Sequence, residues 1–245
     1  MKSLEQFAIL SDSNSSSARA TERCHLDDAY RDRAINVLGD LSEVVTSSIV
    51  PNLENYQSRW HPSGFMVFAL GKHELGFLRL HVWPDFPRQA APKGDTIHDH
   101  AWFIASLALA TYRDAMYEVS ASTIVPTEEV IPTDLLRVYS ALYHPDGSQT
   151  VRTDGSCVKA TVAKRRVVPA GASHTIEPGI FHRPEIPDED FAATLVLSSF
   201  RTKPDGPYFL ANDDVGTSYN VRPNATLEQI NSVKAALLMG EVAGS

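Results

Sequence analysis

The middle of this chain is a succession of short apolar segments, rich in β-branched and aromatic residues, that are separated by glycine- and proline-containing turns. Segments of roughly four to eight residues bounded in this way are typical of β-strands. Helical spacing of apolar residues occurs only toward the two ends of the chain. We therefore predict a mainly β fold, a single antiparallel β-barrel with an N-terminal and a C-terminal helix. The predicted strands cover residues 65–70, 76–83, 104–112, 115–119, 137–143, 158–168, 173–177 and 193–200.

Two amphipathic segments predict the helices. In residues 26–45 the apolar side chains recur every three or four positions, so we expect one helix that packs on the outside of the barrel. Thr226 and Gln229 have the spacing of a capping box, in which each residue satisfies a backbone amide of the other. This pair predicts the start of a second helix, with Ile230 and Val233 on its buried face.

Four segments follow from these features. Residues 1–20 are polar and small and are expected to be disordered, and residues 21–64 form a helical N-terminal decoration. Residues 65–209 form the barrel, and residues 210–245 form a C-terminal extension that carries a helix. Residues 120–134, rich in Ser, Thr, Pro and Glu, are expected to be a loop excursion from the barrel.

Two histidines separated by one residue are the main chemical feature. On an extended chain His98 and His100 point to the same side while Asp99 points to the other. Two imidazoles on one face can hold one metal ion. We expect His182 to supply a third nitrogen, with imidazole nitrogens within about 4 Å of one another because ligand bonds measure about 2.0–2.2 Å. Gly179, three positions before His182, predicts a tight turn.

Three neutral imidazoles do not select one metal. They suit Fe(II), Zn(II), Ni(II), Mn(II) or Cu(II), and intrinsic affinity alone favours copper or zinc. Ferrous iron with three ligands on one face keeps three positions open for a chelating substrate and O2. Zinc in the same site keeps one position open for a water of lowered pKa. The sequence therefore leaves both oxygenase and Lewis-acid chemistry open.

The spacing of these motifs resembles a known superfamily. His98-x-His100, followed at a distance by Gly171 and by Gly179-x-x-His182, resembles the two motifs of the cupins. The resemblance covers residues 76–200, about half of the chain. It implies a jelly-roll-like cupin barrel that holds a metal ion.

One branch of the cupins is the most similar. Ile97-His98-Asp99-His100 and His182-Arg183-x-Glu185 resemble the cysteine dioxygenases, in which three histidines hold a ferrous iron that adds O2 to a small thiol. Trp83 also has a counterpart in that branch. The resemblance implies that Fe(II) is the cofactor and that His98, His100 and His182 are both the metal ligands and the catalytic centre.

The chain departs from this pattern at two places. The glutamate ligand of the common cupin motif is replaced by Ile104 and Ala105, which favours a site of three histidines alone. The positions of the Ser-His-Tyr relay that thiol dioxygenases carry hold Leu195, Leu197 and Ser199. We expect the two leucines to make one wall of the pocket apolar, for a substrate larger or more hydrophobic than cysteine.

Candidate substrate-binding residues follow from strand alternation. Arg79, His81 and Trp83 share one face of the strand over 76–83, and the resemblance directs Trp83 into the barrel. A buried Arg79 would need an anionic partner such as a substrate carboxylate. In the opposite orientation Arg79 would be solvated, because alternation fixes parity but not direction.

Three further side chains lie close to the motifs in the sequence. Trp102 continues the face of His100 and is expected to line the pocket. His174, eight residues before His182, is either a fourth polar group of the pocket or a structural residue near a turn. His61 lies in a turn-forming stretch and is expected to be structural.

Composition excludes several classes of function. The formal net charge is −8 and the isoelectric point is near 5.6, which argues against nucleic acid and anionic membranes as partners. Two cysteines in 245 residues form no disulfide framework. The sequence has no signal-peptide core and no stretch of about 18 apolar residues, so we expect a cytoplasmic protein.

We therefore expect a metal-dependent cupin, foremost a mononuclear non-heme Fe(II) oxygenase that uses O2 on a small carboxylate-bearing, amino-acid-like metabolite. A redox-neutral isomerase, lyase or hydrolase of the same fold is the first alternative, and a cupin that only binds a ligand is the second. The expected partners are a small-molecule substrate and O2, and a homodimer stays open.

Overall fold

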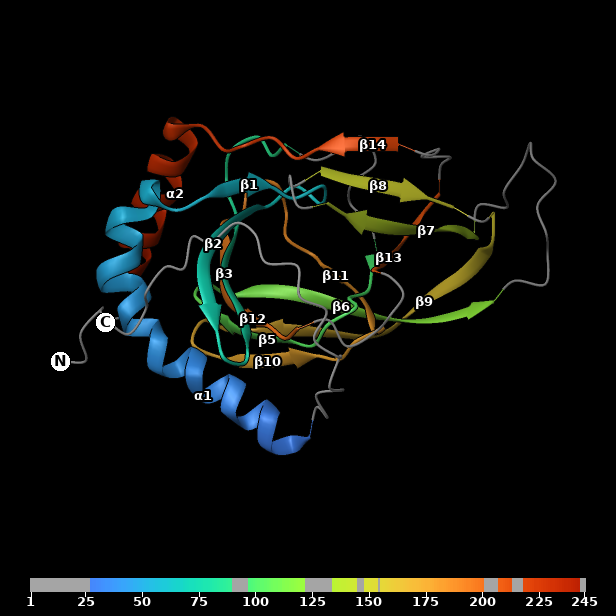
Figure 1. The fold of residues 1–245 in the computed structure, drawn as a ribbon, viewed down its shortest axis with the longest axis horizontal. Helices are drawn as coiled ribbons and strands as arrows, with labels where there is room; N and C mark the ends of the chain where they lie inside the picture. Colours follow the sequence, from blue (N-terminus) through green and yellow to red (C-terminus); the bar gives the residue numbers. More distant parts are fainter. Residues whose placement is uncertain are drawn as a thin grey trace, which may run out of the picture.

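The computed structural model describes residues 27–89, 97–121, 134–144, 148–153, 155–200, 207–212 and 218–242. Within these ranges the chain forms two antiparallel sheets, and two long helices lie on one side of them (Figure 1). The prediction of a mainly β fold with a helix toward each end is thereby confirmed. The expected disorder of residues 1–20 and most of the expected excursion over 120–134 lie outside the described residues.

The first sheet has six strands and packs against the helices. Its strands, in spatial order, are β1 (Ser58–Trp60), β2 (Met66–His73), β3 (Gly76–Trp83), β12 (Ala192–Ser198), β5 (Ile104–Ala108) and β10 (Ser173–Ile176). Alternation along β3 divides its side chains between two environments. Leu78 and Leu80 belong to the apolar clusters beneath the helices. Trp83, on the other face, stacks on Tyr112 of the second sheet, with ring centroids 6.1 Å apart.

The second sheet has eight strands and extends away from the helices (Figure 1). Its strands, in spatial order, are β13 (Tyr208–Ala211), β4 (Ile97–His98), β11 (Phe181–Pro184), β6 (Tyr112–Ala121), β9 (Cys157–Val168), β7 (Leu136–Tyr143), β8 (Ser148–Arg152) and β14 (Ser218–Val221). Strand β13 also pairs with β7, so the first strand of this order is bonded to a strand near its end. The closed barrel of cupin type stays a prediction.

The first helix is held by a cap and by an apolar stripe. Helix α1 (Asp28–Val44) begins after Asp27, whose Oδ1 accepts a hydrogen bond from the backbone amide of Tyr30 at 2.8 Å. Tyr30, Ala34 and Leu38 are buried in one cluster with side chains of the six-stranded sheet. The chain then continues through the π-helical turn η2 (Val45–Ile49) and the 3₁₀ segment η3 (Val50–Asn55). The helix therefore packs outside the sheets, as the sequence predicts.

The second helix, α2 (Leu227–Val242), begins with the expected capping box. The backbone amide of Gln229 donates to Thr226 Oγ1 at 3.2 Å, and the backbone amide of Thr226 donates to Gln229 Oε1 at 2.9 Å. Ile230 and Val233 are buried against the six-stranded sheet. Neither helix within the described residues is both long enough and apolar enough to cross a membrane.

The largest difference from the expected elements is a corner in the predicted strand over 104–112. Strand β5 ends at Ala108 in one sheet, and β6 begins at Tyr112 in the other. The backbone amides of Leu109 and Ala110 both donate to the carbonyl oxygen of Ala193 at this corner. The apolar run through the corner carries no turn residue, which is why the sequence reads as one strand.

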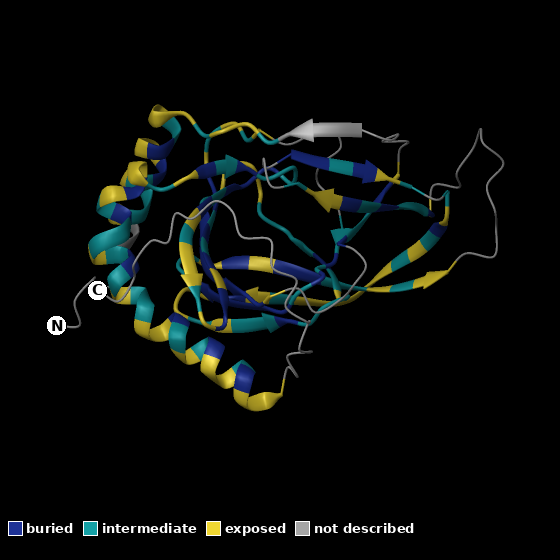
Figure 2. Cartoon of the chain, in the orientation of Figure 1, coloured by how far each residue is buried: buried dark blue, intermediate teal, exposed yellow. Residues whose placement is uncertain are grey.

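The predicted strand ranges do not include β1, β4, β8, β11, β13 and β14, although the segment of β4 was expected to be extended. Strand β14 reads Ser-Tyr-Asn-Val and lies inside the range 210–245 that was assigned to a C-terminal extension. Pairing with β8 nevertheless makes it part of the eight-stranded sheet. The buried residues concentrate between the two sheets and beneath the helices (Figure 2). The space between the sheets is where the candidate site lies.

Candidate metal centre

The structure brings together the three histidines of the two sequence motifs. One ligand nitrogen from each of His98, His100 and His182 lies within 4.8 Å of the others. His98 ends β4 and is the direct cross-strand partner of His182 on β11, and His100 follows two residues later. The three rings present different planes to one another, with interplanar angles of 89°, 52° and 47°. Rings that converge in this way surround a point rather than stack.

One of the three nitrogen separations fits two ligands of the same ion. The Nε2 atoms of His100 and His182 are 3.0 Å apart. Two nitrogens bonded to one metal at about 2.1 Å and at a right angle are separated by about 3 Å. The limit of 4.8 Å for the whole group is wider than the about 4 Å expected from the sequence. The pair at 3.0 Å meets the expected separation, and the limit of 4.8 Å is compatible with metal binding by all three histidines.

Backbone and side-chain hydrogen bonds fix the segment that carries His98 and His100. Asp99, between them, is buried on the opposite side, and its Oδ1 accepts from the backbone amide of Tyr208 on β13 at 2.6 Å. Gly179, with a φ of 84°, donates its amide to the carbonyl oxygen of His100 at 3.0 Å. A φ in the left-handed region favours glycine, which explains the residue at this turn. Through the hydrogen bond to His100, the same turn before His182 also holds the loop that carries His100. The two motifs are thus tied to each other.

A buried carboxylate orients His182. Asp114 on β6 is 1% exposed, and its Oδ1 lies 3.0 Å from His182 Nδ1. Its other oxygen accepts two hydrogen bonds from Arg166 on β9, at 2.7 and 3.2 Å. A carboxylate at Nδ1 favours the tautomer with the proton on that nitrogen, which frees Nε2 for a metal ion.

The same contacts keep the carboxylate charged. Burial alone would raise the pKa of Asp114, but the hydrogen bonds from His182 and Arg166, together with the positive charge of Arg166, outweigh burial and lower it. A lowered pKa means that Asp114 remains an acceptor for the imidazole. Asp114 is not among the site residues predicted from the sequence. The only signal of Asp114 in the sequence is a carboxylate within a predicted β region, two positions after the aromatic Tyr112 and directly before the apolar Ala115 and Met116.

We predict that Asp114→Asn weakens metal binding by about 10- to 100-fold, because partners of this kind set the orientation and basicity of a histidine ligand. The measurement is a competitive titration of Zn(II) against a chelator at pH 7. Glu185→Gln is the matched control, since Glu185 pairs with Arg165 across the same region but contacts none of the three histidines. Equal affinity in Asp114→Asn and wild type would contradict the role of Asp114.

The candidate substrate residues of β3 face the second sheet. Arg79 Nη1 donates to Ser198 Oγ at 3.1 Å, and the rings of His81 and Phe65 lie 5.0 Å apart. Burial lowers the pKa of His81 to about 3, and burial together with a neighbouring positive charge lowers the pKa of Arg79. Of the two orientations left open by the sequence, the structure has the inward one. Substrate binding by Arg79, His81 and Trp83 stays a prediction.

The other two candidate residues lie in different places. The ring of Trp102 is 5.8 Å from that of His100, next to the metal ligands. His174 lies on β10, and its Nε2 is 3.0 Å from the hydroxyl of Tyr112. Its Nδ1 is buried with no hydrogen-bond partner in the described part of the chain. His174 is therefore not one of the clustered histidines.

The expected apolar wall at Leu195 and Leu197 is wrong. Both leucines are buried in the cluster with Tyr30 and Leu38 of α1, on the face of β12 that looks toward the helix. Their cross-strand partners on β3, Leu80 and Leu78, point the same way. The face of β12 that looks toward the second sheet carries the alternating residues, among them Ser198. Hydrophobicity does not show which face of β12 looks toward the site, because every residue of this strand is buried.

His61 is closer to the site than its turn suggested. Its ring stacks on Phe65 at 4.3 Å and lies 6.2 Å from the ring of His98. Burial first, and the positive charge of Arg222 next, lower its pKa well below the usual value. His61 is therefore a neutral, half-buried imidazole beside the candidate ligands. The sequence predicted only a structural residue in a turn, so the position of His61 next to His98 comes from the three-dimensional contacts alone.

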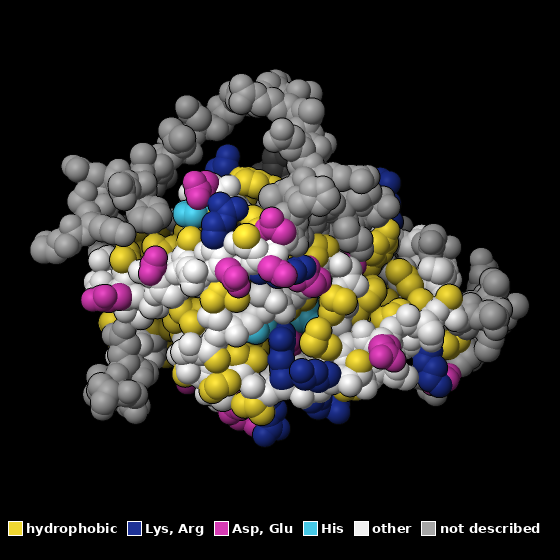
Figure 3. Space-filling model, turned by 90° about the horizontal axis from the view of Figure 1, so that it is seen from below, with side chains coloured by type: hydrophobic (Ala, Val, Ile, Leu, Met, Phe, Trp, Pro, Cys, Tyr) yellow, Lys and Arg dark blue, Asp and Glu magenta, His cyan; other side chains and the backbone are white. Residues whose placement is uncertain are grey.

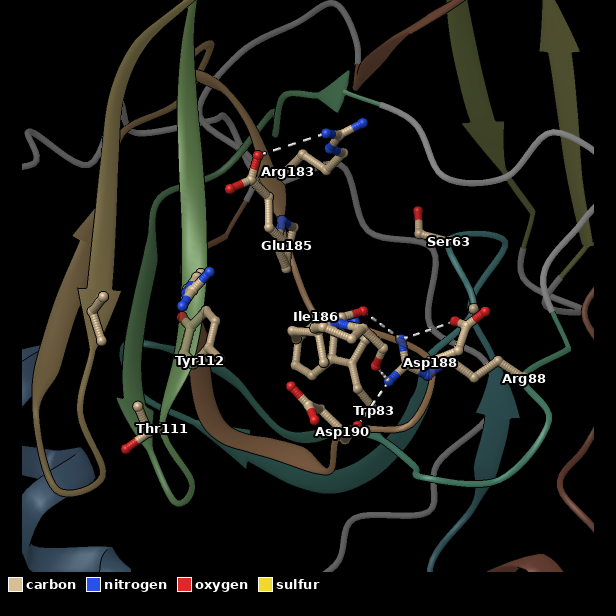
Figure 4. A pocket seen from close by; sticks show the side chains of 15 residues that line it. Ser63, Trp83, Arg88, Thr111, Tyr112, Arg183, Glu185, Ile186, Asp188 and Asp190 are labelled. Atoms are coloured by element: carbon tan, nitrogen blue, oxygen red, sulfur yellow. Dashed lines mark hydrogen bonds and ion pairs between the residues drawn. The ribbon is translucent and has the colours of Figure 1, made fainter.

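A cavity of about 880 Å³ lies at another part of the space between the sheets (Figure 4). Trp83, Tyr112 and Arg88 line it, together with Arg183 and residues that follow it, but the three histidines do not. Trp83 also lies 6.3 Å from His81, so its ring is shared by the cavity wall and by the surroundings of the histidine cluster. Arg88 donates hydrogen bonds to backbone carbonyl oxygens, including that of Ile186 at 2.9 Å, and so joins the segment after β3 to the segment after β11.

Two half-buried histidines, His81 and His174, predict that stability falls in mild acid. Burial lowers the pKa of His81 to about 3 and that of His174 to about 4, while an unfolded histidine titrates near 6.5. Below pH 6.5 the unfolded chain binds protons that the folded chain excludes, so the free energy of unfolding falls. Each group contributes a loss that approaches about 1.4 kcal/mol per pH unit between pH 6.5 and its folded pKa.

Urea unfolding at pH 7, 6 and 5 measures this loss. His174→Gln should show a shallower fall than wild type, because one of the titrating groups is gone. Equal stability of the wild type at pH 7 and pH 5 would contradict the burial of these imidazoles as neutral groups.

The chain was compared with known proteins at the level of sequence. A scan against models of protein families and a search of curated proteins both gave no match.

Proposed function

We propose that this chain is a mononuclear non-heme Fe(II) oxygenase of the cupin class, which uses O2 to oxidise a small carboxylate-bearing metabolite. The observation that carries the proposal is the convergence of His98, His100 and His182, with His182 oriented by the buried carboxylate of Asp114. The pairing of β13, the first strand of the second sheet, with β7, the sixth, supports the cupin barrel that belongs to this proposal.

The donor set fits a divalent transition metal. Burial first, and then the neighbouring imidazoles of His98 and His182, disfavour protonation of His100 and lower its pKa well below the usual value, so this imidazole is neutral at pH 7. A neutral imidazole has the free lone pair that a metal ion needs. Ile104 and Ala105 are buried in apolar clusters, so these two positions offer the group no further ligand. Ferrous iron in a three-histidine site supplies the one-electron chemistry that activates O2.

The surrounding side chains would bind and shield a substrate. Arg79 is half-buried and carries a charge that a substrate carboxylate can neutralise through paired hydrogen bonds. Phe65 and Trp83, whose ring centroids are 4.7 Å apart, form an aromatic row next to His81. Such a row excludes water from one side of the histidine cluster, and a low dielectric strengthens the interaction of Arg79 with an anion.

The experiment is an oxygen-uptake assay on the full chain. Protein loaded anaerobically with Fe(II) is mixed with air-saturated buffer and a panel of small carboxylic and amino acids. We expect O2 consumption that requires both Fe(II) and one class of carboxylate substrate. The Zn(II)-loaded protein is the matched control and should consume none.

Two outcomes would count against the proposal. Turnover by the Zn(II)-loaded protein in anaerobic buffer would replace the oxygenase by a redox-neutral enzyme. Rapid and stoichiometric oxidation of cysteine would end the expectation that cysteine is not the substrate, while leaving the oxygenase in place.

A further inference from the structure

A second arginine lies beside the candidate substrate residues. Arg222 follows β14, and its guanidinium carbon is 4.5 Å from the ring centre of Tyr143 on β7. The ring of Tyr143 is 6.4 Å from that of Trp102, and Trp102 is 5.8 Å from His100. This row of contacts connects Arg222 to a candidate metal ligand. Arg79 approaches the same histidines from β3. It shares a face of that strand with His81, whose ring lies 5.0 Å from Phe65, and Phe65 stacks on His61 beside His98.

The contacts of the two arginines orient them without neutralising them. Arg79 donates to the hydroxyl of Ser198 at 3.1 Å, and Arg222 donates to the side-chain oxygen of Gln149 at 3.2 Å. Within the described ranges neither guanidinium has a carboxylate partner. Arg222 Nε is in addition buried with no hydrogen-bond partner among those residues. Each side chain therefore keeps unused donors.

The two charges also repel each other. Burial, and then the positive charge of Arg222, lower the pKa of Arg79. Two like charges held partly out of water cost free energy unless an opposite charge joins them. The overall net charge of −8 makes this local excess of positive charge the more unusual. On the face shown in Figure 3, by contrast, basic and acidic side chains are interspersed.

We propose that Arg79 and Arg222 together bind a dianionic group of the substrate, a pair of carboxylates or a phosphate, next to the three histidines. Guanidinium groups suit both chemistries because their planar fork forms two parallel hydrogen bonds to oxygens. Two such forks match two negative charges, whereas a single carboxylate leaves one fork uncompensated. This inference rests on the proposed function for the placement of the reacting end of the substrate at the histidines.

The test compares three probes by isothermal titration calorimetry, namely succinate, inorganic phosphate and the monoanion butyrate. The protein is the full chain, both without metal and loaded with Zn(II). We expect succinate or phosphate to bind at least about tenfold more tightly than butyrate, since a second guanidinium contact strengthens binding of the second charge. A preference for succinate identifies a dicarboxylate, and a preference for phosphate identifies a phosphate ester. Equal affinity for all three probes, or binding of none, would overturn the proposal.

Variants assign the preference to the two residues. Arg222→Gln should abolish the preference for succinate or phosphate over butyrate. Arg222→Lys keeps the positive charge and should therefore retain part of this preference. Arg152→Gln, at an exposed arginine of β8, is the matched control and should leave the preference unchanged. An unchanged preference in Arg222→Gln would overturn the role of Arg222. The comparison of the probes on the wild type needs no variant, so a variant that fails to fold does not decide the outcome.

The failure of this inference can be told apart from that of the proposed function. Binding of a dianion by the metal-free chain supports the arginine pair whatever the oxygen assay shows. Consumption of O2 with monocarboxylates alone, without any preference for dianions, would overturn the arginine pair and keep the oxygenase.

Discussion

Gly76→Ala is expected to destabilise the protein by at least about 3 kcal/mol, a large part of the about 5–15 kcal/mol that holds a typical domain folded. Gly76 begins β3 with a φ of 150°, and a Cβ at this position would lie 2.0 Å from the carbonyl oxygen of Ser198. The obstacle is backbone rather than a flexible side chain, so the clash is relieved only if β3 and β12 move apart. Because Ser198 also accepts a hydrogen bond from Arg79, the movement would reach the candidate site.

Urea and thermal unfolding measure this effect. For a chain of this size, about 3 kcal/mol corresponds to a fall of roughly 6–12 °C in Tm. Gly39→Ala is the matched control, because Gly39 lies in α1 and a Cβ there meets no atom within 4 Å. It should be neutral or stabilise the protein by up to about 1 kcal/mol through helix propensity. A Gly76→Ala protein that unfolds at the wild-type temperature would show that the two strands do not approach so closely.

His100→Ala is expected to lower metal affinity by more than about 100-fold, because it removes one of only three candidate ligands. His100 is half-buried and lies in a loop, so the two sheets should remain folded without it. The measurement is the metal content after anaerobic loading and gel filtration, followed by a chelator competition. His73→Ala is the control, since His73 lies in the β2–β3 hairpin and bonds the amide of Leu75. Full metal occupancy in His100→Ala would remove this residue from the site.

The sequence was informative about the histidines because their geometry is local. Two residues apart on an extended chain, His98 and His100 share a side whatever the rest of the fold does. The glycine turn before His182 is likewise a local property, since its φ of 84° favours glycine. Short-range rules therefore predicted these three residues. The direct cross-strand pairing of His98 with His182, by contrast, depends on the register of β4 and β11, which is not a local property.

The partners of the histidines depend on register between distant strands. Asp114 reaches both His182 and Arg166 only because β6 lies between β11 and β9, with Asp114 directly opposite Arg166. The pairing of β6 with β9 also shifts after Met116, which no sequence pattern announces. Arg222 is placed by a strand whose polar sequence gave no strand signal. These contacts are properties of the assembled sheets.

The direction of a strand's faces was also beyond the sequence. On β3 alternation grouped Arg79 with Trp83, and the structure turns that face toward the second sheet. On β12 the same rule grouped Leu195 with Leu197, and the structure turns that face toward α1. Alternation fixes which residues share a side, while packing between layers decides which side is inward. Where both faces are buried, as on β12, hydrophobicity does not distinguish them.

X-ray absorption at the iron edge of anaerobically loaded protein tests the central claim most directly, because it counts the imidazoles bound to the metal. The geometry of His98, His100 and His182 predicts one iron per chain with three imidazole nitrogens at about 2.0–2.2 Å, no sulfur ligand and no second metal. The remaining positions should be filled by oxygen from solvent. Fewer than three imidazoles, or a bound thiolate, would contradict a three-histidine centre.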